Sequence, residues 1–231
     1  MEPVATFYDN NGFKTLVFDN AMPESAVSLW LEARKNIKFY KTVHDKIPMD
    51  FRVYPVNTQD RKNFFNLNSW LQPYLTAFHK DLDVDKGFAR SFINCYQKND
   101  HIRVHADLNP KDFTDEELYA VVLLFLTPDE YINDPTDCGF VINNSFTTKD
   151  FIVHNKFNRM VIMDARSLHE PVVPTDNFQR LTLYAGYTIS PNNDALSRVS
   201  RENRLIEFGQ VPGTRYEFNE SDWINVDWHL Y

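Results

Sequence analysis

Five short apolar segments in the second half of the chain alternate with polar loops. They are FARSFINCYQ (88–97), YAVVLLFL (119–126), GFVIN (139–143), RMVIMDA (159–165) and RLTLYAGYTI (180–189). Their β-branched and aromatic residues, and the Pro- and Asp-containing loops around them, are typical of β-strands. This spacing favours an all-β sandwich or jelly roll over an alternating βαβ fold.

The first 87 residues follow a more helical pattern. FKTLVFD (13–19) has strand character, and a helix is expected from about Pro23. The apolar residues of that helix fall on one face, at Ala26, Val27, Trp30 and Leu31. A second helical pattern has its apolar residues at Leu67, Trp70, Leu71, Tyr74, Leu75 and Phe78. Pro73 lies inside this second pattern, so the helix either kinks there or begins just before it.

No repeat, low-complexity tract or Gly/Ser-rich linker divides the chain, so we expect one domain over residues 1–231. Residues 1–87 would form an N-terminal helical support, and residues 88–190 a jelly-roll core. Residues 191–231 would form a C-terminal extension, which ends in the aromatic and acidic DWINVDWHLY. The expected fold class is therefore mainly β with flanking helices.

Composition and charge exclude several classes of protein. Hydrophobic residues make up 43% of the 231 residues, which excludes wholesale disorder. The formal net charge of −8 lacks the basic field that attracts nucleic acid, so nucleic acid is disfavoured as a partner. The longest apolar run is far shorter than the ~20 residues of a membrane-spanning helix, and the first residues show no signal peptide. We therefore expect no membrane contact and a cytoplasmic location.

The two cysteines, Cys95 and Cys138, are too few for a disulfide scaffold or a four-cysteine zinc site. Both are expected to be reduced and half-buried thiols.

Candidate chemistry lies at two points of the second half. His105 and Asp107 are two residues apart, so in an extended segment their side chains project from the same face. His169 follows the strand-like segment 159–165. Two histidines and one carboxylate form a ligand set that suits non-haem Fe(II). The alternative reading of His105 and Asp107 is a surface pair at a strand end.

Arg180 and Thr182 share one face of the last strand-like segment. An arginine fork beside a hydroxyl is a natural receptor for a carboxylate, because it offers paired charge-assisted hydrogen bonds and one further donor. The alternative is a surface arginine in an ion pair. Together, the four residues His105, Asp107, His169 and Arg180, in this order, favour the functional reading.

Three runs in the second half together resemble the core of the Fe(II)/2-oxoglutarate-dependent dioxygenases, prolyl-4-hydroxylase-like branch. They are CYQKNDHIRVHADLNP, LLFLTPDEYINDPTDCGFVI and FNRMVIMDARSLHEPVVPTDNFQRLTLYAGY. The resemblance implies a double-stranded β-helix, which is a jelly-roll, cupin-like barrel. By the match, His105, Asp107 and His169 are the iron ligands, and Arg180, Thr182 and Tyr96 bind 2-oxoglutarate. Gly139 lies where the family usually has a Gly-Gly pair, and Cys138 replaces the first glycine.

The same resemblance implies an enzyme that couples decarboxylation of 2-oxoglutarate to succinate with hydroxylation of a C–H bond. Fe(II) and 2-oxoglutarate would be required, and ascorbate could serve to keep the iron reduced. The substrate would be a prolyl or other peptidyl residue, or a small amino-acid-like molecule. Two alternatives remain open: a non-catalytic jelly-roll binding protein, and a zinc-dependent hydrolase that uses the same His/Asp/His set. The oligomeric state is left open.

Three further charged residues are weaker candidates. Arg103 lies two residues before His105, and Arg166 and Glu170 flank His169. Arg103 and Arg166 could bind substrate, and Arg166 and Glu170 could also orient the ligand. For Arg166 and Glu170, the alternative is a salt bridge at the barrel mouth.

Overall fold

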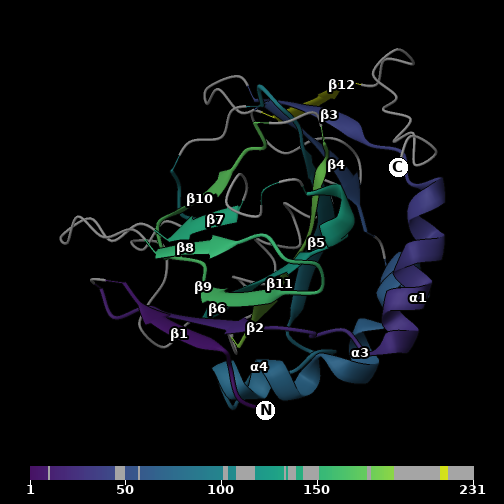
Figure 1. Ribbon diagram of the computed structural model, residues 1–231. Coiled ribbons are helices and arrows are strands. Elements are labelled where there is room, and N and C mark those ends of the chain that lie inside the picture. Colours follow the sequence, from purple (N-terminus) through teal and green to yellow (C-terminus); the bar gives the residue numbers. More distant parts are fainter. Residues whose placement is uncertain are drawn as a thin grey trace.

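The computed structural model describes residues 1–9, 11–44, 50–56, 58–100, 104–107, 118–132, 134, 139–142, 151–175, 178–189 and 214–217. Within these residues, two antiparallel sheets form a β-sandwich with helices on one side (Figure 1). The expected fold class, mainly β with flanking helices in a jelly-roll arrangement, is confirmed. No helix in the described ranges is long and apolar enough to cross a membrane.

The large sheet has nine strands in the order β1-β2-β9-β6-β11-β5-β4-β3-β12. Their bounds in that order are Ala5–Tyr8, Lys14–Phe18, Met160–Asp164, Tyr119–Phe125, Arg180–Thr188, Phe88–Tyr96, Asp50–Pro55, Tyr40–His44 and Thr214–Glu217. The small sheet has the order β10-β7-β8, with bounds His169–Val172, Gly139–Ile142 and Phe151–His154. His105 adds an isolated antiparallel bridge to His169 of β10.

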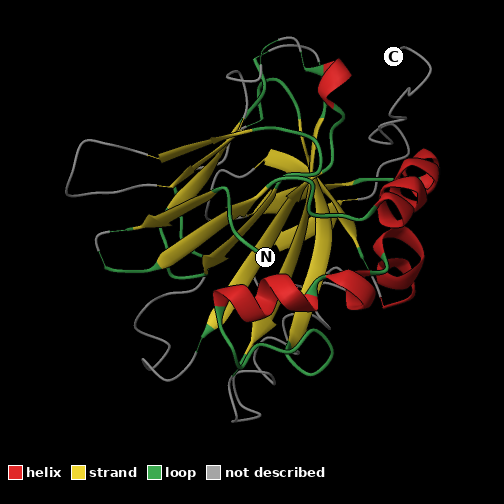
Figure 2. Cartoon of the chain, turned by 60° about the horizontal axis from the view of Figure 1, so that its bottom comes forward, coloured by secondary structure: helices red, strands yellow, loops and turns green. Residues whose placement is uncertain are grey.

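The helices cover the outer face of the large sheet, as Figure 2 shows. They are α1 (Glu24–Ala33), α2 (Thr58–Asp60), α3 (Leu67–Trp70) and α4 (Gln72–Phe78), with the 3-10 turns η1 (Arg34–Asn36) and η4 (Asp129–Tyr131) and the π-helix η2 (Arg61–Phe65). The second predicted helix is broken at Leu71, between α3 and α4, and Pro73 is the second residue of α4. This break agrees with the expected effect of proline on a helix.

All five strands expected after residue 88 are present, as β5, β6, β7, β9 and β11, and the strand expected at 13–19 is β2. The first 87 residues also supply β1, β3 and β4, so this part of the chain extends the large sheet as well as covering it. The chain divisions at residues 88 and 191 remain predictions.

Two apolar cores lie on opposite faces of the large sheet. One core fills the space between the two sheets, and the other lies between the large sheet and the helices. β11 contributes to both: Leu181 and Leu183 face the helices, and Tyr184 faces the barrel interior. By the two-residue period of a strand, Arg180 and Thr182 also face the interior. The strand is buried on both faces, which explains its near-continuous apolar sequence.

Gly139 of β7 is required by the close approach of β8. A Cβ atom at this position would lie 2.5 Å from the carbonyl oxygen of Val153, a contact that the backbone could relieve only by moving. A glycine at position 139 is therefore required by the packing of β8 against β7 in this chain. Cys138 lies outside the described residues.

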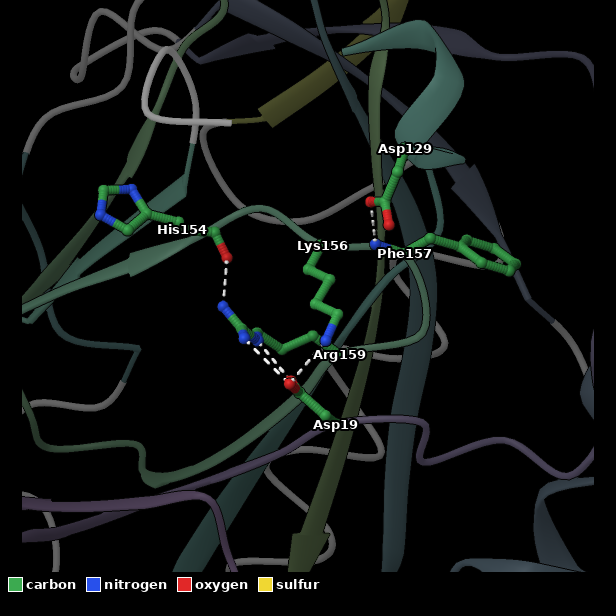
Figure 3. A network of polar contacts seen from close by, with 6 residues as sticks. All are labelled: Asp19, Asp129, His154, Lys156, Phe157 and Arg159. Carbon is green, nitrogen blue, oxygen red and sulfur yellow. Dashed lines mark hydrogen bonds and ion pairs between the residues drawn. The ribbon is translucent and has the colours of Figure 1, made fainter. Parts of the chain in front are cut away.

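Asp19, at the end of β2, anchors the segment that leads into β9 (Figure 3). One of its carboxylate oxygens accepts a hydrogen bond from Arg159 Nε at 2.6 Å, and the other accepts from Lys156 Nζ at 2.8 Å. Asp129 accepts the Phe157 N–H in the same segment at 2.6 Å. The hydrogen bond from Arg159 lowers the pKa of Asp19 to about 2.

We expect Asp19→Asn to lower the free energy of unfolding at pH 7 by about 1 kcal/mol, as for other partly exposed ion pairs. Because the folded-state pKa lies below its ordinary value, the contribution is complete above the unfolded-state pKa. It is lost as the pH falls toward 2. Urea unfolding at a series of pH values should therefore show that the difference in free energy of unfolding between wild type and Asp19→Asn narrows below pH 4. Glu130→Gln, at an exposed carboxylate, is the control. A difference in free energy of unfolding between wild type and Asp19→Asn that stays constant with pH would contradict the prediction.

Candidate metal centre and diacid pocket

The structure brings the side chains of His105, Asp107 and His169 together. Backbone hydrogen bonds of 2.9 and 2.8 Å join His105 to His169 in both directions, so the two rings lie side by side with centroids 4.4 Å apart. The Asp107 carboxylate reaches both rings, at 3.8 Å from His105 Nε2 and 3.7 Å from His169 Nε2. One donor atom from each residue lies within 4.8 Å of the others. This set could hold a metal ion.

His169 is prepared to act as a neutral donor. Its Nδ1 lies 2.9 Å from the carbonyl oxygen of Ser167, which fixes Nδ1 as the protonated nitrogen and leaves the Nε2 lone pair facing Asp107. Burial lowers the pKa of His169, which favours the uncharged ring that a metal requires. The ring also packs against Phe140, with centroids 5.0 Å apart.

The remaining donor of the set, Asp107 Oδ2, is buried and accepts no hydrogen bond from the described residues. A buried carboxylate oxygen without a donor is costly unless a cation or a proton satisfies it. Two imidazole nitrogens and one carboxylate, with this oxygen available, fit the ligand preferences of Fe(II).

Arg180 lies at the start of β11 and is only 1% exposed. Its guanidinium lies between the rings of Tyr96 and Phe125, 5.1 and 5.2 Å from their centroids, and Nη1 donates to the Val172 carbonyl at 3.2 Å. Arg180 pairs with Tyr96 across β11 and β5. The Thr182 hydroxyl is also buried and has no hydrogen-bond partner among the described residues. A fixed cation and an available hydroxyl can together bind a carboxylate.

β10 links the candidate metal ligands to Arg180. β10 carries the chain from His169 to Val172, where Arg180 donates its hydrogen bond. Three residues of strand span about 10 Å, so the Val172 carbonyl that accepts this hydrogen bond lies about that far along the backbone from His169. β11 begins at Arg180 and continues to Thr188.

The other predicted residues have different outcomes. Arg166 forms a two-point ion pair with Asp164, at 2.9 and 2.8 Å, and its guanidinium lies 4.4 Å from the Phe13 ring. These contacts support the salt-bridge reading of Arg166, and a role in substrate binding remains an untested prediction. Arg103 lies outside the described residues. Cys95 is fully buried rather than half-buried, and burial raises the pKa of its thiol.

Sequence reasoning missed the interior residues of β5. Asn94 and Phe92 share the interior face with Tyr96, and Phe92 stacks on Tyr184 with centroids 4.4 Å apart. The signal was available, because the two-residue period that places Thr182 beside Arg180 also places Asn94 beside Tyr96.

Comparison with known proteins gives matches in structure only. Neither a protein-family profile nor a curated protein sequence matches the chain. A prolyl-4-hydroxylase from Pseudomonas putida matches with a TM-score of 0.56 and 15% identity, over 75% of this chain and 91% of that chain. HygX from Streptomyces hygroscopicus, with nickel and 2-oxoglutarate bound, matches with a TM-score of 0.53 and 15% identity, over 75% and 82%.

The α-ketoglutarate-dependent epimerase SnoN from nogalamycin biosynthesis matches with a TM-score of 0.56 and 9% identity, over 75% of this chain and 76% of that chain. At these identities the likeness concerns the fold. The chain therefore has the fold seen in the prolyl-4-hydroxylase, HygX and SnoN structures.

Proposed function

We propose that this protein is a non-haem Fe(II)- and 2-oxoglutarate-dependent dioxygenase that hydroxylates a C–H bond. The observation that carries the proposal is one barrel interior with two complementary groups. The His105/Asp107/His169 set could hold a metal ion, and the buried Arg180 beside Thr182 donates to the carbonyl of Val172, on the same strand as His169. A metal site alone would suit many reactions. The buried Arg180 would bind the distal carboxylate of 2-oxoglutarate, and a zinc hydrolase would not need such a cation.

The residues of the chain would divide the work as follows. His105, Asp107 and His169 would hold Fe(II) from one side, with His169 oriented by Ser167. Arg180 and Thr182 would bind the distal carboxylate of 2-oxoglutarate, and Tyr96 would line the same pocket.

When bound, Fe(II) would supply the dioxygen chemistry that couples oxidation of 2-oxoglutarate to succinate and carbon dioxide with substrate hydroxylation. The protein's part is to orient both ligands and to exclude water. The apolar core around Phe140 and Tyr184 would provide that exclusion. Ascorbate would keep the iron reduced between turnovers.

The proposed substrate is a prolyl or other peptidyl residue, or a small amino-acid-like molecule. The structural likeness to a prolyl-4-hydroxylase supports the first class. SnoN is named as an epimerase, so the same fold supports more than one kind of reaction. A cytoplasmic location remains part of the proposal.

The test is an anaerobic titration of metal-free protein with Fe(II) and then with 2-oxoglutarate. Chelation of the iron should produce a visible charge-transfer band, and Arg180→Ala should need more 2-oxoglutarate to reach the same absorbance. No band at any loading would contradict the proposal. Activity with zinc in place of iron would then favour a hydrolase, and inactivity with every metal a non-catalytic binding protein.

A further inference from the structure

The turn that joins β9 to β10 leads directly into the candidate ligand His169. Asp164 is the last residue of β9, and its carbonyl oxygen accepts the Ser167 N–H at 3.0 Å, which closes the turn. The Ala165 N–H donates to the Tyr119 carbonyl of β6 at 2.9 Å, so the turn is attached to the large sheet. His169 then begins β10. The place of this ligand in the barrel therefore depends on the turn.

The Asp164 side chain fixes the conformation of the turn. Asp164 is 4% exposed, and its Oδ1 accepts both the backbone N–H of Arg166 at 3.0 Å and Arg166 Nε at 2.9 Å. Its Oδ2 accepts from Arg166 Nη2 at 2.8 Å. The guanidinium also lies 4.4 Å from the centroid of the Phe13 ring. A two-point pair of this kind has a defined geometry, so the residue just before Ser167 is held through both its backbone and its side chain.

Ser167 connects this ion pair to the candidate ligand. Its carbonyl oxygen lies 2.9 Å from His169 Nδ1, and a carbonyl oxygen can only accept, so Nδ1 carries the ring proton. The backbone of His169 is held separately, by its two hydrogen bonds with His105. The direction of the ring therefore depends on the Ser167 carbonyl more than on the strand itself.

We infer that Asp164 and Arg166 are positioning residues of the metal centre: their ion pair holds the turn so that the Ser167 carbonyl fixes the His169 ring with Nε2 toward Asp107. The inference rests on the proposed function. Neither Asp164 nor Arg166 belongs to the candidate ligand set, and both act through Ser167. The partner of the second ring nitrogen sets the tautomer and the direction of a ligand histidine, so loosening the turn should weaken metal binding.

Nuclear magnetic resonance of the metal-free protein with isotope-labelled histidine tests the ring directly. The ring-nitrogen shifts show which nitrogen of His169 carries the proton, and exchange with solvent shows how firmly that proton is held. Comparison with His169→Gln identifies the signals. In wild type the proton should lie on Nδ1. In Asp164→Asn and in Arg166→Met it should exchange about fivefold faster, the effect of one weakened hydrogen bond.

Anaerobic competition with a chelator measures the Fe(II) affinity of the same proteins. Asp164→Asn and Arg166→Met should each bind Fe(II) about tenfold more weakly, the lower end of the range for a lost outer-shell partner. The two variants alter opposite sides of the ion pair, so one of them still gives the test if the other does not fold.

Asp19→Asn is the matched control. Asp19 forms the same kind of two-point ion pair with Arg159, at 2.6 and 3.1 Å, as Figure 3 shows. Arg159 directly precedes β9, so this pair lies at the opposite end of the strand from Asp164. Asp19→Asn should therefore lower stability without changing the exchange of the His169 ring proton or the affinity for Fe(II).

Two outcomes would overturn the inference alone. One is wild-type proton exchange and Fe(II) affinity in both Asp164→Asn and Arg166→Met. The other is an equal change in Asp19→Asn, which would mean that a general loss of stability causes the effect. Failure of wild type to bind Fe(II) would overturn the proposed function instead. Because proton exchange is measured without metal, it would still decide whether the ion pair holds the His169 ring.

Discussion

Asp107→Ala is expected to abolish iron-dependent conversion of 2-oxoglutarate to succinate while the fold remains intact. Asp107 supplies the carboxylate of the candidate set. Its Oδ2 accepts no hydrogen bond from the described residues, so the substitution removes no hydrogen bond of that oxygen that stabilises the fold. Loss of an outer-shell partner typically lowers metal affinity or activity about 10–100-fold, so loss of a ligand should exceed a hundredfold. His105→Ala should behave in the same way.

The measurements are succinate formation, bound iron per chain and the thermal unfolding midpoint. Glu130→Gln is the control, because this exposed carboxylate is not in the metal set. Full activity in Asp107→Ala would contradict the assignment of the metal centre. A large fall in the unfolding midpoint would instead mean that Asp107 has a structural role.

Arg180→Ala is expected to weaken 2-oxoglutarate binding by about 1.5–3 kcal/mol, the range for a lost charge-assisted hydrogen bond. The guanidinium is fixed between Tyr96 and Phe125, so little freedom is lost when it binds a carboxylate. Calorimetry of the Fe(II)-loaded protein measures the change. Arg180→Met is the second variant, because it fills more of the buried space and separates the loss of charge from the loss of packing.

A matched control is Arg61→Met. Arg61 is also buried, at 6% exposure, but its guanidinium lies 3.4 Å from the Phe88 ring and donates to Asn68 on the helix side of the sheet. Both variants remove a buried guanidinium, and only the Arg180 variant should lose affinity for 2-oxoglutarate. An unchanged affinity in Arg180→Met and Arg180→Ala would mean that the distal carboxylate binds elsewhere.

The strands with the strongest apolar patterns were predictable because burial on one or both faces leaves a mark in the sequence. β6 and β11 are buried along their full length, and both were expected from composition alone. β3 and β4 were not, because YKTVH and DFRVYP mix charged and apolar residues. β4 pairs with β5, a strand more than thirty residues away in the chain, and β3 in turn pairs with β4.

The same distinction holds for the site. The sequence by itself determined which residue types could bind iron and a carboxylate, because the period of a strand places His105 beside Asp107 and Arg180 beside Thr182. Only the tertiary structure decided that His169 pairs with His105, and that Arg180 lies beside Tyr96 and Phe125. These contacts join segments through side-chain directions and strand register, and the register is set by the packing of both sheets rather than by any local pattern.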